Sequence, residues 1–501
     1  MNMTSIQNDF EAVIGLEVHA QLATDSKIFC GCRARLLGGH GGESVADVAV
    51  NLNTCPVCSG HPGALPVLNR KAVEFAIMAG LATHCRINPR SVFARKSYFY
   101  PDLPKGYQIS QYDQPICEAG WLEISTSATP KKIRIDRIHM EEDAGKNIHL
   151  SGFSVVNLNR AGVPLIEIVS APDMRTAEEA GAYLRALHGV VTYLGICDGN
   201  MQEGNFRCDA NVSVMPKGAK EFGTRAEIKN VNSFRFIEKA IEFEIRRQIE
   251  VLRAGGRVVQ ETRGYDSARN VTVSLRTKEE AQDYRYFPDP DLIPLRIEDS
   301  WVVSIQSMIP ELPAQKFARF ISEFGLSQYD ADVLIASKTV AEFYEECVGI
   351  LRVAYPDPFD LRAASKAAAN WTTGELMRLL NEEGRELSAS KIRSEHIADL
   401  VRLTQSRVVS STGAKQALGV AWKTGESIET IVEREGLRQV SDTGALEVSI
   451  DKIIAGFPAQ VAEYKAGKEK IIGFLVGQVM KQSGGKANPS LVQELLKKKL
   501  S

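Results

Sequence analysis

The densest concentration of reactive side chains in the sequence is the acidic run Glu141–Asp143, which follows His139 and precedes the segment Ala144–Lys146. Residues 132–138 alternate between charged and apolar types, which predicts a β-strand leading into the acids. Adjacent carboxylates repel one another, so burying them together costs free energy unless a cation shares the pocket. The run therefore either faces water, as most charge runs do, or holds a hard cation such as Mg²⁺.

A second candidate lies in residues 14–22, whose alternation of apolar and polar side chains predicts a half-buried strand. Glu17 and His19 share its polar face. Such a face usually meets only water, but a carboxylate and an imidazole two residues apart also suit a metal or phosphate site. Segments 209–214 and 225–229 alternate in the same way. If these strands pair, their polar faces form one hollow lined by Glu17, His19, Glu141, Glu142, Asp209 and Glu227.

Four of the nine cysteines form two close pairs, Cys30 with Cys32 and Cys55 with Cys58. This spacing fits a tetrahedral zinc site with four thiolate ligands on two turns. His40, in the glycine-rich loop between the pairs, could compete as a ligand. Four protein ligands leave no open position, so the zinc would be structural; the alternative is four free cysteines. Disulfides are not expected in a chain without a secretion signal.

Residues 95–111 combine three tyrosines and three cations with two prolines and few aliphatic side chains. One interpretation is a packed aromatic turn. The other is a surface on which rings stack on nucleobases and cations meet phosphates.

The elements that would position these residues are spread along a chain of 501 residues, long enough for two to four domains. Helical patterns are found at 70–82, from Thr176 onward and at 233–252. The composition changes near 283–291, and beyond residue 310 the pattern is helical. From 462 to 501 eight lysines accompany three glutamates, an excess of +5 that indicates either nucleic-acid contact or a solvated lysine-rich end.

Several function classes are excluded by what the sequence lacks. It contains no GxxxxGK[ST] phosphate loop, no GxSxG elbow and no HExxH metal motif. No apolar run is long enough to span a bilayer, and residues 1–10 lack the features of a signal peptide. We therefore expect a cytoplasmic protein.

Blocks throughout the chain resemble the family of B subunits of aspartyl/glutamyl-tRNA amidotransferases. The matching segments are 14–22, 95–111, 139–146, 157–169, 201–214, 225–234, 283–291, 473–481 and 485–489. The resemblance implies an α+β fold, with a glutamine-synthetase-like cradle built on a largely antiparallel sheet and followed by two all-α parts. We expect the cradle at 1–297, with a zinc knuckle insertion at about 29–60, a helical connector at 298–405 and a helical tail that binds tRNA at 406–501.

The resemblance also implies an ATP-dependent carbon–nitrogen ligase. Such an enzyme phosphorylates the side-chain carboxylate of Glu-tRNA(Gln), Asp-tRNA(Asn) or both, and then amidates it. The ammonia would come from a partner amidase, the A subunit, in a heterotrimer completed by a small C subunit. Two alternatives stay open: a free-standing metal-dependent carboxylate-amine ligase, and a non-catalytic scaffold that binds tRNA.

Carried over to this sequence, the family motifs imply ATP, Mg²⁺ and structural Zn²⁺ as cofactors. The implied Mg²⁺ ligands are Glu17, His19, Glu141, Glu142, Asp209 and Glu227, of which the first four would be catalytic. The implied Zn²⁺ ligands are Cys30, Cys32, Cys55 and Cys58, in a knuckle that some family members carry and others lack. Lys96, Lys105 and Arg207 are candidates for phosphate contacts, chosen from charge and position.

Overall fold

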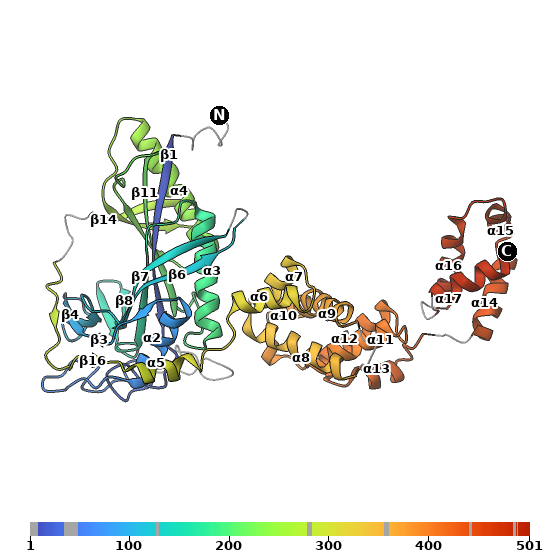
Figure 1. The fold of residues 1–501 in the computed structure, drawn as a ribbon, viewed down its shortest axis with the longest axis horizontal. Coiled ribbons are helices and arrows are strands. Elements are labelled where there is room, and N and C mark those ends of the chain that lie inside the picture. Colours follow the sequence, from blue (N-terminus) through green and yellow to red (C-terminus); the bar gives the residue numbers. More distant parts are fainter. Residues whose placement is uncertain are drawn as a thin grey trace. The chain divides into compact units, whose positions relative to one another are not determined.

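The computed structural model describes residues 9–34, 49–126, 130–277, 283–354, 360–439, 443–483, 487 and 489–500. His40 and much of the predicted knuckle insertion lie outside these residues. The chain divides into two compact units, 1–313 and 314–501 (Figure 1). The first unit is built on a large sheet and the second is helical, which confirms the predicted α+β class.

A nine-stranded sheet forms the centre of the first unit. Its strands, in spatial order, are β14 (Val271–Thr277), β13 (Glu261–Asp266), β12 (Ala226–Val231), β11 (Phe206–Pro216), β1 (Phe10–Gln21), β10 (Pro164–Ser170), β7 (Lys131–Glu142), β6 (Cys117–Ile124) and β2 (Arg86–Ile87). Neighbouring strands are antiparallel except β12 and β13. The first strand of the sequence thus lies in the middle of the sheet, where strands from distant segments flank it.

Three amphipathic helices pack against this sheet: α2 (Arg70–Ala82), α3 (Ala177–Tyr193) and α4 (Phe234–Arg253) (Figure 1). Each begins at a polar capping residue whose side chain accepts backbone N–H bonds: Asn69, Thr176 and Ser233. The apolar residues of the central strands are buried in the same core as these helices. They include Leu16, Val18, Ile138, Met140, Ile166, Ile168, Ala210 and Val212. Because side chains alternate along a strand, the residues between them face the other side of the sheet.

Smaller strands border the sheet and bring in the tyrosine-rich segments. β4 (Phe93–Ser97) pairs with both β5 (Tyr107–Gln111) and β15 (Phe287–Pro288). β8 (Lys146–Leu150) and β9 (Phe153–Asn157) form a hairpin after the acidic run, and β3 (Arg90–Ser91) pairs with β16 (Leu295–Arg296). Segments 95–111 and 283–291 therefore lie beside each other.

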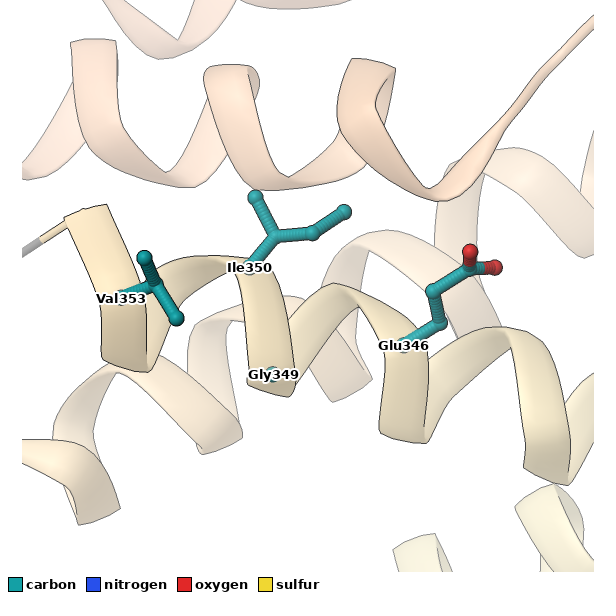
Figure 2. Close-up of a pocket in the computed structure, with 4 residues that line it drawn as sticks. All are labelled: Glu346, Gly349, Ile350 and Val353. Atoms are coloured by element: carbon teal, nitrogen blue, oxygen red, sulfur yellow. The ribbon is translucent and has the colours of Figure 1, made fainter.

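The second unit consists of short helices. They are α6 (Pro313–Ser322), α7 (Gln328–Ile335), α8 (Lys338–Ala354), α9 (Leu361–Asn370), the π-helix η2 (Trp371–Leu376), α10 (Met377–Glu383), the 3₁₀ turn η3 (Leu387–Ala389), α11 (Ser394–Gln405), α12 (Ser411–Thr424), α13 (Ile428–Arg434), α14 (Thr443–Gly456), α15 (Pro458–Lys465), α16 (Ile471–Gln482) and α17 (Pro489–Leu500). A pocket on α8, lined by Glu346, Gly349, Ile350 and Val353, is the surface hollow drawn in Figure 2. In the described part of the chain no helix is both long and apolar enough to cross a membrane.

The packing refines the expected domain boundaries. Helix α5 (Asp299–Gln306), which we placed in the connector, contacts α2 and buries Ile305 in the core of the first unit. Helices α12 and α13, which we placed in the tail, contact α11. Helices α14–α17 share a hydrophobic cluster of their own. The three-part division itself remains a prediction.

Candidate functional site

The strand registers place polar residues from five strands on one face of the sheet. Glu17 of β1 lies opposite Asp209 of β11, and Asn211 lies opposite Glu227 of β12. On the other side of β1, His19 lies opposite Glu167 of β10. Glu167 in turn lies opposite His139 of β7, two residues before Glu141. Because residues directly opposite in neighbouring strands point to the same side, these groups converge away from the helices.

Glu17, Asp209 and Glu227 form one acidic triad, in which one carboxylate oxygen from each lies within 4.8 Å of the others. Lys229 lies between two of them, with its Nζ 2.9 Å from Asp209 Oδ2 and 3.0 Å from Glu227 Oε1. Burial raises the pKa of Glu17 most, and the neighbouring carboxylates raise it further. Burial lowers the pKa of Lys229, but Asp209 and Glu227 outweigh it and raise the pKa overall. The triad is a site of concentrated negative charge that favours a cation.

His19, Glu141 and Glu167 form a second triad beside the first. His19 Nε2 lies 3.5 Å from Glu141 Oε1 and 3.3 Å from Glu167 Oε2. Burial alone would lower the pKa of His19, but the hydrogen bond and charge of Glu167, together with Glu141, raise it to about 8. Glu167 also lies 3.3 Å from His139 Nε2. Burial would raise the pKa of Glu167, but its contacts with His139 and His19 hold it well below the usual range.

The donor atoms of the two triads fit hard divalent cations. Five of the six side chains are carboxylates, and the sixth is an imidazole whose ring nitrogen faces the two acids of its triad. Mg²⁺ prefers oxygen ligands and usually keeps several waters, so three protein ligands are sufficient for one ion. Because Glu17 and His19 are two residues apart on β1, one strand contributes a ligand to each triad.

Glu142 does not join these residues, and our prediction that it lines the same hollow is wrong. It alternates with Glu141 along β7 and therefore points to the helix-covered side of the sheet. There it is buried, forms an ion pair with Lys105, and accepts a hydrogen bond from the backbone N–H of Ile109 at 2.9 Å. Adjacent acids in a strand face opposite sides, so only one of them could reach the cluster.

The three expected phosphate contacts lie in different environments. Lys105 is paired with Glu142, as described above. Lys96 Nζ lies over the ring of Tyr284, 4.8 Å from its centroid. Arg207 is the only one whose strand position pairs it directly with a triad residue, His19. Arg207 also donates from Nη2 to Asp143 Oδ1 at 3.3 Å.

Tyrosines of the paired segments 95–111 and 283–291 form a cluster, two of whose members are influenced by the charge of Glu141. Tyr284 makes edge contacts with Tyr98 and Tyr286, with centroid separations of 5.8 and 6.2 Å. Tyr286 also stacks on Tyr112 at 4.2 Å. Burial, and then the charge of Glu141, raise the pKa of Tyr98 and of Tyr286. Aromatic faces next to an acidic cluster are suited to stack a nucleobase while metal ions hold its phosphates.

Comparison with known proteins identifies the family of this chain. A family model described as the GatB/GatE catalytic domain matches residues 12–303, and one described as the GatB domain matches residues 359–500. The chain belongs to the family of amidotransferase B subunits. Three curated relatives are named as the B subunit of aspartyl/glutamyl-tRNA(Asn/Gln) amidotransferase. They come from Trichlorobacter lovleyi (58% identical), Geobacter sulfurreducens (55%) and Syntrophotalea carbinolica (54%), each covering 98% of this chain and 99% of the relative. The family resemblance predicted from sequence is confirmed.

In this B-subunit chain the four predicted knuckle cysteines do converge. The sulfur atoms of Cys30, Cys32, Cys55 and Cys58 all lie within 4.8 Å of one another. Cys58 Sγ is 4.0 Å from that of Cys32 and 3.9 Å from that of Cys55. Tetrahedral zinc with Zn–S bonds of about 2.3 Å requires sulfur separations of about 3.8 Å, so the cluster fits this ion. The buried Lys27 ammonium, 3.6 Å from Cys58 Sγ, favours thiolate at that position.

Sequence reasoning missed two residues of the candidate site. Glu167 is the only charged residue of the strand 164–170, and a lone acid in an apolar strand was the available signal. Lys229 lies on a polar face that was identified, but its role as counter-ion to Asp209 and Glu227 depends on strand pairing. Both required the register across β1, β10, β11 and β12, which local periodicity does not supply.

Proposed function

We infer that this chain is the B subunit of a tRNA-dependent amidotransferase, an ATP-dependent ligase that forms the side-chain amide on Glu-tRNA(Gln), Asp-tRNA(Asn) or both. The similarity over nearly the full length of curated B subunits supports the assignment to this complex. The observation that carries the catalytic role is the convergence of two ligand triads on one face of one sheet.

We propose that each triad holds one Mg²⁺ ion. Glu17, Asp209 and Glu227 would hold one, and His19, Glu141 and Glu167 the other. When bound, these ions neutralise the phosphate charge of ATP, which is the main requirement for phosphoryl transfer between two anions. Lys229 occupies a position between two ligands and would move aside or remain as a further positive charge.

The proposed reaction has two steps. A carboxylate oxygen of the aminoacyl side chain attacks the γ-phosphorus of ATP, the bond to the bridging oxygen breaks, and ADP leaves. Ammonia then adds to the activated acyl carbon, the bond to the phosphate oxygen breaks, and inorganic phosphate and a proton are released. Arg207 and Lys96 would orient phosphate oxygens, and the tyrosines near Glu141 would exclude water and stack a base.

Glu142 has a different proposed role. Because it pairs with Lys105 on the helix-covered side, we propose that it fixes Lys105 and the end of β7 instead of binding Mg²⁺. The Lys105 ammonium is therefore not available as a simple phosphate contact while this pair is intact.

The remaining proposals concern partners and cofactors. We propose that ammonia comes from a partner amidase, the A subunit, that a small C subunit completes a heterotrimer, and that the complex acts in the cytoplasm. The four cysteines would hold a structural zinc ion that braces this edge of the cradle. Helices α14–α17, with the local excess of positive charge, would contact tRNA.

A single-turnover assay tests the catalytic proposal. The complex is mixed with mischarged tRNA, Mg²⁺ and γ-labelled ATP without any ammonia donor, and transfer of label to the aminoacyl end is followed. Glu17→Gln should abolish this transfer while tRNA binding and assembly persist. If the chain were only a scaffold, even the unaltered complex would transfer no label. If it were a free-standing ligase, it would turn over ATP in the absence of tRNA.

A further inference from the structure

A pair of arginines converges on a buried carboxylate beside the second triad. Asp143, the third acid of the run, has only 3% of its side chain exposed. Arg160 Nε lies 3.0 Å from its Oδ2, and Arg207 Nη2 lies 3.3 Å from its Oδ1. Gln21 Nε2 donates to Oδ2 at 2.7 Å, and the backbone N–H of Ala144 donates to Oδ1 at 3.0 Å. The carboxylate is thus saturated with donors and fixes both guanidinium groups.

The carboxylate of Asp143 cannot accept hydrogen bonds from all the N–H groups of two arginines. A guanidinium carries five N–H donors in a rigid fork. The Nε of Arg207 is buried and has no hydrogen-bond partner among the described residues. A buried donor without an acceptor is unfavourable, which points to an acceptor supplied from outside the chain.

The chain also leaves space next to the pair. Gly204 has a positive φ of 78°, and a Cβ built there would stand 3.8 Å from Arg207 Cδ and 4.0 Å from Arg160 Nη1. Glycine therefore keeps a side chain off both arginines. Their side chains remain 31% and 39% exposed, although the carboxylate beneath them is closed off. A ligand can approach the guanidinium groups but not Asp143.

The position of the pair relates it to the reaction centre. Arg207 is the direct strand partner of His19, and its charge acts against the protonation of that imidazole. Arg160 follows β9 in the turn that leads to β10 and Glu167. Asp102 is a second acid near Arg160, and it already accepts hydrogen bonds from its own backbone and from Asn147.

We propose that Arg160 and Arg207, held in place by Asp143 and Gln21, form a phosphate-binding subsite beside the His19 triad. The inference deepens the proposed function and rests on it, because it assigns Arg160, Asp143 and Gln21 to the same centre. Paired guanidinium forks match the oxygens of a phosphate group in a bidentate manner. Two sources share this chemistry: the phosphates of ATP, and a phosphodiester near the 3′ end of the mischarged tRNA.

The test replaces Arg160, which touches Asp143 without touching either triad. Arg160→Gln is compared with Arg160→Lys and with the control Arg134→Gln, whose exposed guanidinium pairs with Asp173 at the other end of β7. Each variant is purified in the whole complex. Binding of ATP with MgCl₂ is measured by equilibrium dialysis, binding of mischarged tRNA by filter retention, and folding by thermal melting.

Loss of a charge-assisted contact should weaken binding of one probe by about 10- to 100-fold in Arg160→Gln. A loss for ATP identifies the nucleotide phosphate, and a loss for tRNA identifies a phosphodiester. Arg160→Lys should recover part of the affinity, because it keeps the charge but not the fork, and Arg134→Gln should change neither. If Arg160→Gln does not fold, Arg160→Lys must itself show the weakened binding.

Two results separate failure of this inference from failure of the proposed function. If both probes bind Arg160→Gln and Arg160→Lys within about twofold of the unaltered complex, the phosphate subsite is overturned, whatever Glu17→Gln does. If Glu17→Gln also transfers label normally, the proposed function fails as well.

Discussion

Glu141 and Glu142 are chemically identical neighbours, and the structure predicts opposite consequences for their replacement. Glu141→Gln removes the charge of a proposed Mg²⁺ ligand in the His19 triad and should leave the helix-covered core unchanged. Glu142→Gln leaves both triads intact and removes the charged partner of a largely buried ammonium, since Lys105 and Glu142 expose only 12% and 5% of their side chains. Each change removes one negative charge and keeps the size of the side chain, so each variant is the control for the other.

The magnitudes follow from these environments. Mutation of a residue that only supports a metal ligand already lowers metal affinity by about 10- to 100-fold. Replacing a proposed ligand itself, as in Glu141→Gln, should therefore raise the half-saturating Mg²⁺ concentration at least about tenfold. Leaving a buried charge without its partner costs about 3–5 kcal/mol, so Glu142→Gln should lower the free energy of unfolding by that order. Glu141→Gln should be less destabilising, because its charged neighbour His19 keeps Glu167 as a second partner.

Both quantities are measured on the same preparations. tRNA-dependent ATP turnover is titrated with MgCl₂, and urea unfolding gives the change in the free energy of unfolding. We expect a large shift in Mg²⁺ requirement for Glu141→Gln alone and a large loss of stability for Glu142→Gln alone. An equal shift in Mg²⁺ requirement for both variants, with stability unchanged in both, would refute the placement of Glu142 on the other side of the sheet.

Three further outcomes are expected. Replacing His139 by Asn removes the imidazole that contacts Glu167, and should raise the half-saturating Mg²⁺ concentration about 10- to 100-fold. Binding of tRNA should stay normal, and an unchanged Mg²⁺ titration would contradict this expectation. Elemental analysis should find about one zinc per chain, lost in Cys55→Ser, whereas a metal-free native protein would reject the four-thiolate site. Ending the chain after Gln439 removes α14–α17 and keeps the contacts among α11–α13. This truncation should weaken tRNA binding while ATP binding persists; unaltered tRNA affinity would show that α14–α17 serve another purpose.

Local patterns in the sequence predicted much of the site. The alternation in 14–22 placed Glu17 and His19 on one face, and the same reasoning placed Asp209 and Glu227 on theirs. The error at Glu142 came from treating a run of acids as one unit, although the predicted strand 132–138 already implied that neighbours diverge. Strand alternation, extended through residue 142, would have placed Glu141 and Glu142 on opposite faces of the sheet.

The rest depends on contacts between distant segments. Glu167 becomes a ligand candidate only because β10 lies beside β1 in a register that brings it to His19, about 150 positions earlier in the sequence. The packing partners of the helices near the expected domain boundaries also lie far apart in the sequence. Helix α5 is held by packing against α2, and α12 and α13 by packing against α11, which no composition change in the sequence marks.

We propose that both triads bind divalent ions on one face of the sheet, and anomalous diffraction from Mn²⁺-soaked crystals of the complex with ATP tests this most directly. The predicted result is one peak within about 2.3 Å of oxygens from Glu17, Asp209 and Glu227, and a second peak at that distance from His19, Glu141 and Glu167. Manganese found only at other places, with both triads empty in the presence of ATP, would contradict it.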